Sequence, residues 1–234
     1  MNNLSGKKIL ITGGSSGIGK ATAIELVENG ATVCITGRDK DKLENVASKI
    51  NAIPIHFDVS KYNSIAVKTL DAFHSMGGMD VLINNAGIGE FAKLEDIKMN
   101  HFENMFATNV FGLTMLTQEV VKFFKTQQHG TVINIGSSAA TSGFPSGSVY
   151  CASKFALRGL TDCWRQELRK DNIRVILVNP SEVPTAFNNK ERHERDEQEN
   201  KLSSKEISHA IVSAINMDKR GFIPELNVWA TNPF

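Results

Sequence analysis

Short apolar runs rich in β-branched residues alternate along this chain with longer segments of helical periodicity. The runs are "KILIT" (8–12), "TVCIT" (32–36), "IPIHF" (53–57), "VLIN" (81–84), "TVINI" (131–135), "IRVILV" (173–178) and "FIPELNV" (222–228). Helical patterns lie between them, at 18–29, 43–50, 61–75, 102–125, 150–170 and 205–217. Such β-α alternation predicts an α/β fold, a parallel, doubly wound sheet of about seven strands with helices on both faces.

Pro54 restricts where the third strand of that sheet can lie. Proline has no amide hydrogen to donate to a neighbouring strand, so it is confined to a sheet edge or a bulge. The third strand lies at an edge in the Rossmann order 3-2-1-4-5-6, which we therefore expect here. The chain has 234 residues and neither an internal repeat nor a linker, so residues 1–234 are predicted to form a single domain.

The one change in composition is "NKERHERDEQENK" (189–201), which is polar throughout and follows the sixth predicted strand. Its charge alone favours a solvated loop or helix. Its position near the carboxyl ends of the strands also permits a mobile lid over a substrate. Both interpretations stay open at this point.

Charge and hydropathy limit the partners of this chain. Its 26 basic and 25 acidic residues nearly balance, which predicts a small-molecule partner and neither nucleic acid nor an anionic membrane. No apolar run approaches the ~18 residues of a membrane span, and the first residues lack an apolar signal region, so a cytoplasmic location is expected. The widely spaced Cys34, Cys151 and Cys163 predict neither a disulfide framework nor a metal site.

The stretch "ITGGSSGIGKAT" (11–22) fits two kinds of phosphate-binding turn. Taken as Gly, four residues and Gly-Lys it approaches a Walker A loop, but Ala21 stands where that loop needs a hydroxyl for Mg²⁺. Taken from Gly13 it is a strand, a glycine-rich turn and a helix N-terminus, which suits the pyrophosphate of a dinucleotide. Gly13 is then expected to make the tight turn, Gly17 to let the backbone approach phosphate, and Gly19 to let the helix pack closely on the strand.

Five motifs occur in a recognisable order along the chain. They are "TGGSSGIG" (12–19), "NNAG" (84–87), Asn109 in "TNVFG", Ser137 in "INIGS" and "YCASK" (150–154). In order and spacing they resemble the single-domain branch of the short-chain dehydrogenase/reductase family. The resemblance covers nearly the whole chain and implies a single NAD(P)-binding domain that transfers hydride between nicotinamide and a carbonyl or secondary alcohol substrate.

Tyr150 and Lys154 form the predicted proton-transfer pair. They are four residues apart at the start of a helical segment, so their side chains share one face. A phenol with a pKa near ~10 is a poor proton donor and acceptor at neutral pH, and we expect the Lys154 ammonium to lower the pKa of Tyr150. Tyr150 then acts as the general acid toward the alkoxide that forms when a carbonyl accepts hydride, or as the base in reverse.

The resemblance implies two further catalytic residues. It places the catalytic serine thirteen residues before the tyrosine, at Ser137, whose hydroxyl polarises the substrate carbonyl, whereas Ser138 is expected to hydrogen-bond locally in the turn. It also implies that Asn109 holds a water in a proton relay with the lysine. The alternative for Asn109 is a polar residue that kinks or caps a helix.

The resemblance also implies a set of cofactor contacts. Asp58 matches a family residue that faces the adenine amine, and Asn85 and Ala86 lie beside the adenosine ribose. The full implied set is Gly13, Ser15, Ser16, Gly17, Ile18, Gly19, Arg38, Asp58, Val59, Asn85, Ala86, Gly87, Tyr150, Lys154, Pro180, Val183 and Thr185.

The residues after the second strand favour NADP(H) over NAD(H). An NAD-binding site of this kind normally has an acidic residue there for the ribose hydroxyls. Here Gly37 is followed by Arg38, whose guanidinium fits a 2′-phosphate. Asp39 and Asp41 weaken the prediction slightly, because either carboxylate offsets that charge.

One position departs from the family pattern. Ser181 replaces a usual glycine in "NPSEVPT", which raises the question of a strained, positive-φ backbone.

The family pattern does not determine which substrate binds. The substrate pocket is implied to lie between 139–149, the stretch after Thr185 and the C-terminal tail. Phe144, Phe187 and Trp229 offer apolar walls there, or serve as ordinary core or interface residues.

The main alternative function is a catalytically silent NADP(H)-binding sensor, which is expected to lack Tyr150 or Lys154. Ala21 disfavours a nucleotide phosphotransferase. The glycine spacing and the length of the chain disfavour an epimerase of the longer branch of the family. Members of the family are commonly homodimers or homotetramers. The resemblance implies pairing here through the helices at 102–125 and 150–169, Trp164 included.

Overall fold

The computed structural model of the chain describes residues 4–187 and 194–233. Its strands are β1 (Lys8–Ile11), β2 (Thr32–Gly37), β3 (Ile53–His56), β4 (Val81–Asn84), β5 (Gly130–Ile135), β6 (Ile173–Pro180) and β7 (Glu225–Val228). Its α-helices are α1 (Gly17–Glu28), α2 (Lys40–Ile50), α3 (Ile65–Met76), α4 (Met99–Phe106), α5 (Leu113–Gln127), α6 (Ser148–Leu168) and α7 (Ser204–Ile215).

The strands described form one sheet in the order β3-β2-β1-β4-β5-β6-β7, and every neighbouring pair is parallel. The predicted order is therefore confirmed, with β7 added beside β6. Pro54 lies on the edge strand opposite Ile35, as its missing amide hydrogen requires.

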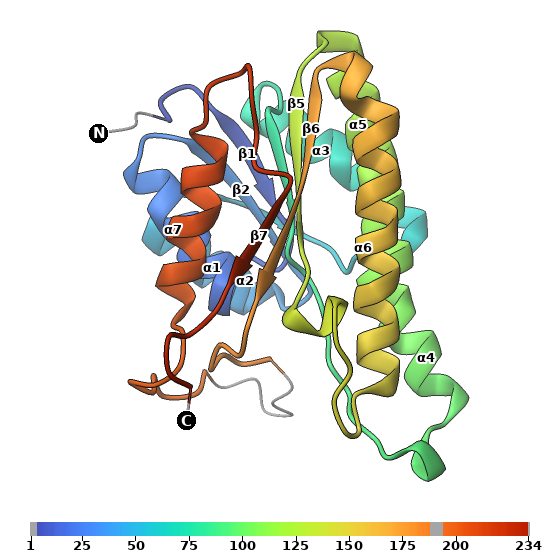
Figure 1. Cartoon of the computed structure of the whole chain (residues 1–234). Helices are drawn as coiled ribbons and strands as arrows, with labels where there is room; N and C mark the ends of the chain where they lie inside the picture. Colours follow the sequence, from blue (N-terminus) through green and yellow to red (C-terminus); the bar gives the residue numbers. More distant parts are fainter. Residues whose placement is uncertain (1–3, 188–193, 234) are drawn as a thin grey trace.

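Helices cover both faces of the sheet (Figure 1). In β1, Ile9 and Ile11 pack into the core beneath α1, α2 and α7, whereas Leu10 between them packs into the core on the side of α3 and α5. This alternation follows from the two-residue repeat of a strand, and it explains why the strands are apolar without interruption. The doubly wound α/β architecture predicted from the sequence is the one observed.

The helical segment expected at 102–125 is longer and less regular than predicted. It runs through α4, a π-helical stretch (Ala107–Gly112) and α5. A π-helical turn widens the helix by one residue and often marks a functional position. Asn109 lies in the middle of this stretch.

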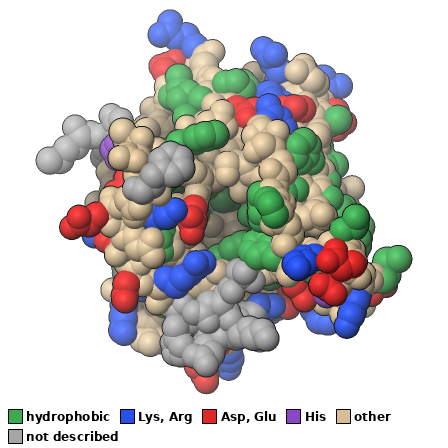
Figure 2. Space-filling model, turned by 60° about the horizontal axis from the view of Figure 1, so that its bottom comes forward, with side chains coloured by type: hydrophobic (Ala, Val, Ile, Leu, Met, Phe, Trp, Pro, Cys, Tyr) green, Lys and Arg blue, Asp and Glu red, His purple; other side chains and the backbone are tan. Residues whose placement is uncertain are grey.

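The loops that follow the strands gather at one end of the sheet, the lower end in Figure 1. Seen from that end, the surface is hollowed near its middle, and hydrophobic side chains lie beside the hollow (Figure 2). The carboxyl ends of strands are where doubly wound folds bind ligands. None of the helices in the described ranges is long and apolar enough to cross a membrane.

Candidate active site

The glycine turn after β1 adopts the tight geometry predicted for it. Gly13 and Gly17 have φ values of 67° and 51°, which disfavour other residues. A Cβ atom at Gly13 would lie 3.0 Å from Cα of Ala86, so this turn packs directly on the one that follows β4. A Cβ atom at Gly19 would collide with Asn85 and with the Gly13 carbonyl. The close packing predicted for Gly19 is therefore against these two turns and not against the strand.

Hydrogen bonds join the turns after β1 and β4. The Thr12 hydroxyl accepts from the backbone N–H groups of Asn85 (3.1 Å) and Ala86 (3.0 Å). The Asn85 side chain donates in return to the carbonyls of Thr12 (2.9 Å) and Gly13 (3.0 Å). Thr12 was not among the predicted site residues, although it lies in the glycine motif, and its buried hydroxyl positions both segments.

The N-terminus of α1 already holds an anionic group. The backbone N–H of Gly17 donates to Oε1 of Glu194 at 3.1 Å, as the partial positive charge of a helix N-terminus favours. The neighbouring Arg195 donates to the carbonyls of Thr185 and Phe187, both at 3.0 Å. Residues 189–193 of the predicted lid lie outside the described residues. The turn donates to a carboxylate oxygen where a pyrophosphate oxygen is expected, so these residues fit the implied cofactor.

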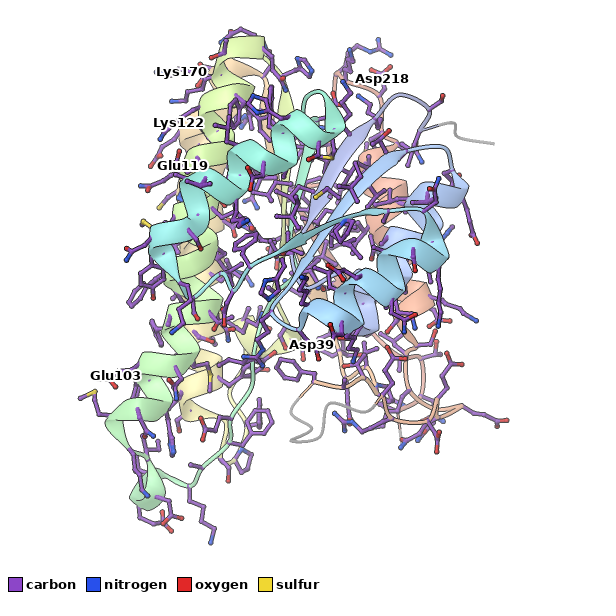
Figure 3. All side chains as sticks on the ribbon, turned by 180° about the vertical axis from the view of Figure 1, so that it is seen from behind. Asp39, Glu103, Glu119, Lys122, Lys170 and Asp218 are labelled. Carbon is purple, nitrogen blue, oxygen red and sulfur yellow. The ribbon has the colours of Figure 1, made fainter. Side chains whose placement is uncertain are left out.

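The residues after β2 leave a cation exposed. Arg38 is exposed, and its side chain makes no hydrogen bond or ion pair with the part of the chain that the structure describes. Asp39 caps α2 by accepting from the Lys42 backbone N–H at 3.0 Å, and it lies at the start of that helix (Figure 3). Its carboxylate is thus engaged locally. After β3, Asp58 accepts from the backbone and side chain of Ser60 at 2.9 and 2.8 Å.

Tyr150 and Lys154 lie together in the first turns of α6, as their spacing predicts. Both side chains are buried, and Nζ of Lys154 is 5.8 Å from the centre of the Tyr150 ring. The ammonium donates to the Ile135 carbonyl at the end of β5, at 2.8 Å. Burial lowers the pKa of Lys154 to about 8. The lysine thus titrates close to the neutral range.

The pKa of Tyr150 is raised in this structure, contrary to the lowered pKa predicted from the sequence. Burial raises the pKa of the Tyr150 phenol, and a side-chain hydrogen bond with Ser137 only partly opposes that effect. The reason is that the phenol is desolvated, which disfavours its charged form. Tyr150 therefore carries its proton at neutral pH, which is the state that a proton donor needs.

Ser137, two residues after the end of β5, is held on two sides. Its backbone N–H donates to Oδ1 of Asn179 at 3.3 Å, and its hydroxyl accepts from the Ala139 N–H at 3.1 Å. The local hydrogen bond expected of the neighbouring Ser138 side chain is thus made by Ser137. Asn179, which the sequence did not single out, is itself fixed by Glu225 (2.8 Å) on β7. The hydroxyl predicted to polarise a carbonyl lies beside Tyr150.

Asn109 uses its whole amide to hold one backbone segment. Its Oδ1 accepts from the Ile88 N–H, and its Nδ2 donates to the Ile88 carbonyl, both at 2.9 Å. Nδ2 also donates to the Ser153 hydroxyl at 3.1 Å. Gly87 packs against it, since a Cβ atom there would be 3.4 Å from Oδ1. Asn109 thus lies inside a π-helical stretch and caps neither end of it, and its role toward a water stays a prediction.

The backbone after β6 is not strained at Ser181. Ser181 is not among the described residues with positive φ. Its N–H donates to the Val228 carbonyl (2.8 Å) and its hydroxyl accepts from the Ala230 N–H (3.3 Å), so serine here continues the pairing between β6 and β7. Beyond it, Thr185 is buried against Gly17: a Cβ atom on that glycine would be 3.1 Å from the threonine.

Three phenylalanine rings contact Tyr150. Phe144 and Phe187, both predicted as wall residues, lie with their ring centres 6.5 and 5.6 Å from that of Tyr150. The third, Phe91 at 5.6 Å, has no sequence signal that distinguishes it from an ordinary loop residue. Trp229, the other predicted wall residue, is 64% exposed after β7.

Comparison with known proteins gives a consistent result. Residues 7–196 match the model of the family described as short chain dehydrogenase. An NADP-dependent 3-hydroxy acid dehydrogenase of Schizosaccharomyces pombe is 35% identical over 195 residues, 80% of this chain and 75% of that protein. Among solved structures, an alcohol dehydrogenase from Thermococcus sibiricus complexed with 5-hydroxy-NADP has a TM-score of 0.89 at 26% identity, covering 96% of this chain and 97% of that one. A 3-ketoacyl-(acyl-carrier-protein) reductase from Brucella melitensis complexed with NADH has a TM-score of 0.88 at 27% identity, covering 99% and 100%.

Proposed function

Since this chain belongs to the short-chain dehydrogenase family, we propose that it is an NADP(H)-dependent carbonyl reductase or alcohol dehydrogenase in which Tyr150 is the general acid and base. Its class is that of an oxidoreductase acting on CH–OH or C=O groups of small molecules. The observation that carries the proposal is the meeting of Ser137, Tyr150 and Lys154 at the carboxyl end of β5.

The proposed chemistry divides among these side chains. NADPH, when bound, supplies the hydride that adds to the carbonyl carbon. The Ser137 hydroxyl donates to the carbonyl oxygen and polarises it. Tyr150 gives its proton to that oxygen as negative charge develops there, which yields the alcohol. The Lys154 ammonium, held by the Ile135 carbonyl, stabilises the phenolate left on Tyr150.

Two observations support NADP(H) as the preferred cofactor. Arg38 presents an exposed guanidinium after β2, and the carboxylate of Asp39 is engaged in capping α2. The S. pombe relative is named as NADP-dependent, and the T. sibiricus structure holds an NADP derivative. We therefore assign the adenosine 2′-phosphate to Arg38, and the adenine and ribose to Asp58, Val59 and the backbone of 85–87.

A catalytically silent sensor is the weaker proposal. Loss of the tyrosine or lysine is the change that would make such a protein inactive, and both residues are present. Tyr150 and Lys154 are moreover buried, and Lys154 and Ser137 are held by hydrogen bonds with separate elements, which cofactor binding alone does not require. The silent-sensor hypothesis predicts NADPH binding without turnover of any carbonyl compound.

For the segment at 189–201 we propose a role at the cofactor site. Glu194 bonds the N–H of Gly17, and Arg195 bonds the backbone that carries Thr185 and Phe187. The segment is therefore attached to the glycine turn by a carboxylate, which competes with a phosphate oxygen for the same donor. Cofactor binding then requires that Glu194 leave this N–H.

We also propose a homodimer or homotetramer that pairs through α4, α5 and α6. Phe111, in the π-helical stretch between α4 and α5, and Phe155 on α6 are 50% and 48% exposed. Gly159, four residues after Phe155, lies inside α6, where glycine weakens a helix, and a Cβ atom there would meet nothing within 4 Å. A partner helix approaching closely explains both features. Light scattering gives the molar mass, and a monomer at micromolar concentration would contradict the pairing.

The experiment that tests the proposed function is NADPH oxidation by the purified chain against a panel of aldehydes and ketones, with NADH as the cofactor control. We expect turnover of at least one carbonyl class, with a higher kcat/KM for NADPH than for NADH. Cofactor binding without turnover across the panel would favour the silent sensor. The cytoplasmic location stays a prediction, which cell fractionation tests.

A further inference from the structure

The aromatic rings around Tyr150 come from three separate loops. Phe91 follows β4, Phe144 precedes α6, and Phe187 follows β6. Phe91 meets Tyr150 edge to face at 82°, and Phe91 and Phe144 meet at a centre distance of 5.6 Å and 68°. The rings of Phe91, Phe144 and Phe187 together are called the phenylalanine wall below.

Two glycines make room for this wall. A Cβ atom at Gly89 would lie 2.5 Å from the Phe187 ring, and one at Gly147 would lie 2.6 Å from the Phe144 ring. Neither glycine is among those with positive φ, so backbone conformation does not require glycine at either position. A side chain at either position would instead displace the ring that lies against it.

A strained backbone residue fixes two of the three loops relative to each other. Ser146 has a φ of 64°, which a residue with a side chain rarely adopts. Its carbonyl accepts from the Ala92 N–H at 3.0 Å, next to Phe91. Strain of this kind persists only where the surroundings hold it, and it occurs preferentially at functional sites. The phenylalanine wall is therefore a positioned structure.

The wall is apolar and only partly covered. Phe91 and Phe144 remain 39% and 44% exposed, although Tyr150 beside them is 9% exposed. The described cation nearest to Phe187 in sequence, Arg195, is committed to two backbone carbonyls. An apolar substituent of the substrate can bury this exposed aromatic surface beside the proton donor, which favours binding. A sugar in the same place would lose hydrogen bonds to water, because the rings cannot pair with its hydroxyl groups.

We propose that the phenylalanine wall selects carbonyl compounds, or the corresponding alcohols, that carry an aromatic ring or a bulky apolar group next to the reacting carbon. Sugars and small hydroxy acids are then poor substrates. This inference rests on the proposed function. It assigns Phe91, Phe144 and Phe187 as specificity residues that touch the substrate, while Ser137 and Tyr150 hold its oxygen.

The test compares kcat/KM with NADPH for benzaldehyde and glyceraldehyde. The wild type is expected to prefer benzaldehyde by at least tenfold. Phe144→Ala and Phe187→Ala should each reduce that preference about tenfold, chiefly by raising KM for benzaldehyde, because the ring loses its apolar contact. Gly147→Ala, which displaces the Phe144 ring without removing it, should act in the same direction. Val67→Ala, a truncation of an exposed residue on α3, is the control and should leave kcat/KM unchanged for both aldehydes.

A conservative replacement tests whether misfolding, rather than loss of the ring, reduces the preference for benzaldehyde. Phe144→Leu keeps apolar volume and should retain more of the preference than Phe144→Ala. Equal or better kcat/KM for glyceraldehyde in the wild type would overturn the substrate class while leaving the proposed function intact. A wall variant that keeps the full preference would overturn the role of that residue. Turnover of neither aldehyde nor any ketone in the panel would overturn the proposed function itself, and this inference with it.

Discussion

The Nζ atom of Lys154 donates a hydrogen bond to the carbonyl oxygen of Ile135, 2.8 Å away. The bond joins α6 to the end of β5 and fixes a buried ammonium 5.8 Å from the centre of the Tyr150 ring. Burying a charge without an ionic partner costs free energy, and proteins keep such groups mainly where function uses them. The pair therefore links the fold of this chain to its proposed chemistry.

Lys154 should set an upper pH limit on carbonyl reduction. Its pKa is lowered to about 8 by burial, so the ammonium loses its proton as the pH rises through that value. Tyr150, whose pKa is raised, keeps its proton well beyond it. The pH profile of kcat/KM is expected to fall with an apparent pKa near 8. A profile that stays flat to pH 10 would show that the charge on Lys154 does not contribute.

Replacing Lys154 with methionine should stabilise the fold while it removes activity. The folded-state pKa, about 8, is below the ordinary 10.5. Folding therefore disfavours the charged form, a penalty fully present below pH 8 and relieved between pH 8 and 10.5. Allowing for the lost bond to Ile135, we expect Lys154→Met to raise the free energy of unfolding at pH 7 by about 1–2 kcal/mol. Urea unfolding measures this, and destabilisation by the variant would contradict the account.

Glu194→Gln should tighten NADPH binding. The carboxylate of Glu194 bonds the Gly17 N–H, which a pyrophosphate oxygen also needs, and the neutral amide is a weaker competitor. A difference of about 1 kcal/mol corresponds to roughly fivefold in Kd. Glu197→Gln, in the same described segment, is the matched control and should leave Kd unchanged. If Glu194→Gln bound NADPH with the same Kd as the wild type, or with a higher one, this carboxylate would not compete with the cofactor.

Arg38→Ala should reduce the preference for NADPH over NADH. A guanidinium bound to a 2′-phosphate makes charge-assisted bonds worth about 1.5–3 kcal/mol, so Kd for NADPH should rise at least tenfold. NADH lacks that phosphate, and its affinity should change little. Fluorescence titration of both cofactors measures the two constants. If NADPH bound the variant as tightly as the wild type, Arg38 would not be the 2′-phosphate ligand.

Much of the fold could be predicted because its signals are local. Unbroken β-branched runs identified the strands, and the missing amide hydrogen of Pro54 placed β3 at the edge of the sheet. The spacing of Tyr150 and Lys154 placed both side chains on one face of α6. The strands and the shared face of α6 follow from the geometry of a single element, and the edge position of β3 needs only the Rossmann strand order in addition.

The remaining features depend on contacts between distant segments. The direction of the Tyr150 pKa shift was predicted wrongly, because the desolvation of its phenol comes from loops that no local pattern describes. Phe91 and Glu194 reach the site from loops whose course follows from tertiary packing. Asn109 shows the difference between the two kinds of feature. Its place in the motif could be predicted, but its hydrogen bonds with the Ile88 backbone and its position in a π-helical stretch could not.

The most direct test of the central claim is the activity of Tyr150→Phe, which removes one hydroxyl and keeps the ring. The variant should fold and bind NADPH like the wild type, because the proposed cofactor contacts lie mainly elsewhere. Its kcat for reduction of the best carbonyl substrate should fall by about 10²-fold or more, the usual contribution of a positioned general acid. A variant that binds NADPH normally and keeps most of its kcat would contradict the assignment of Tyr150 as the proton donor.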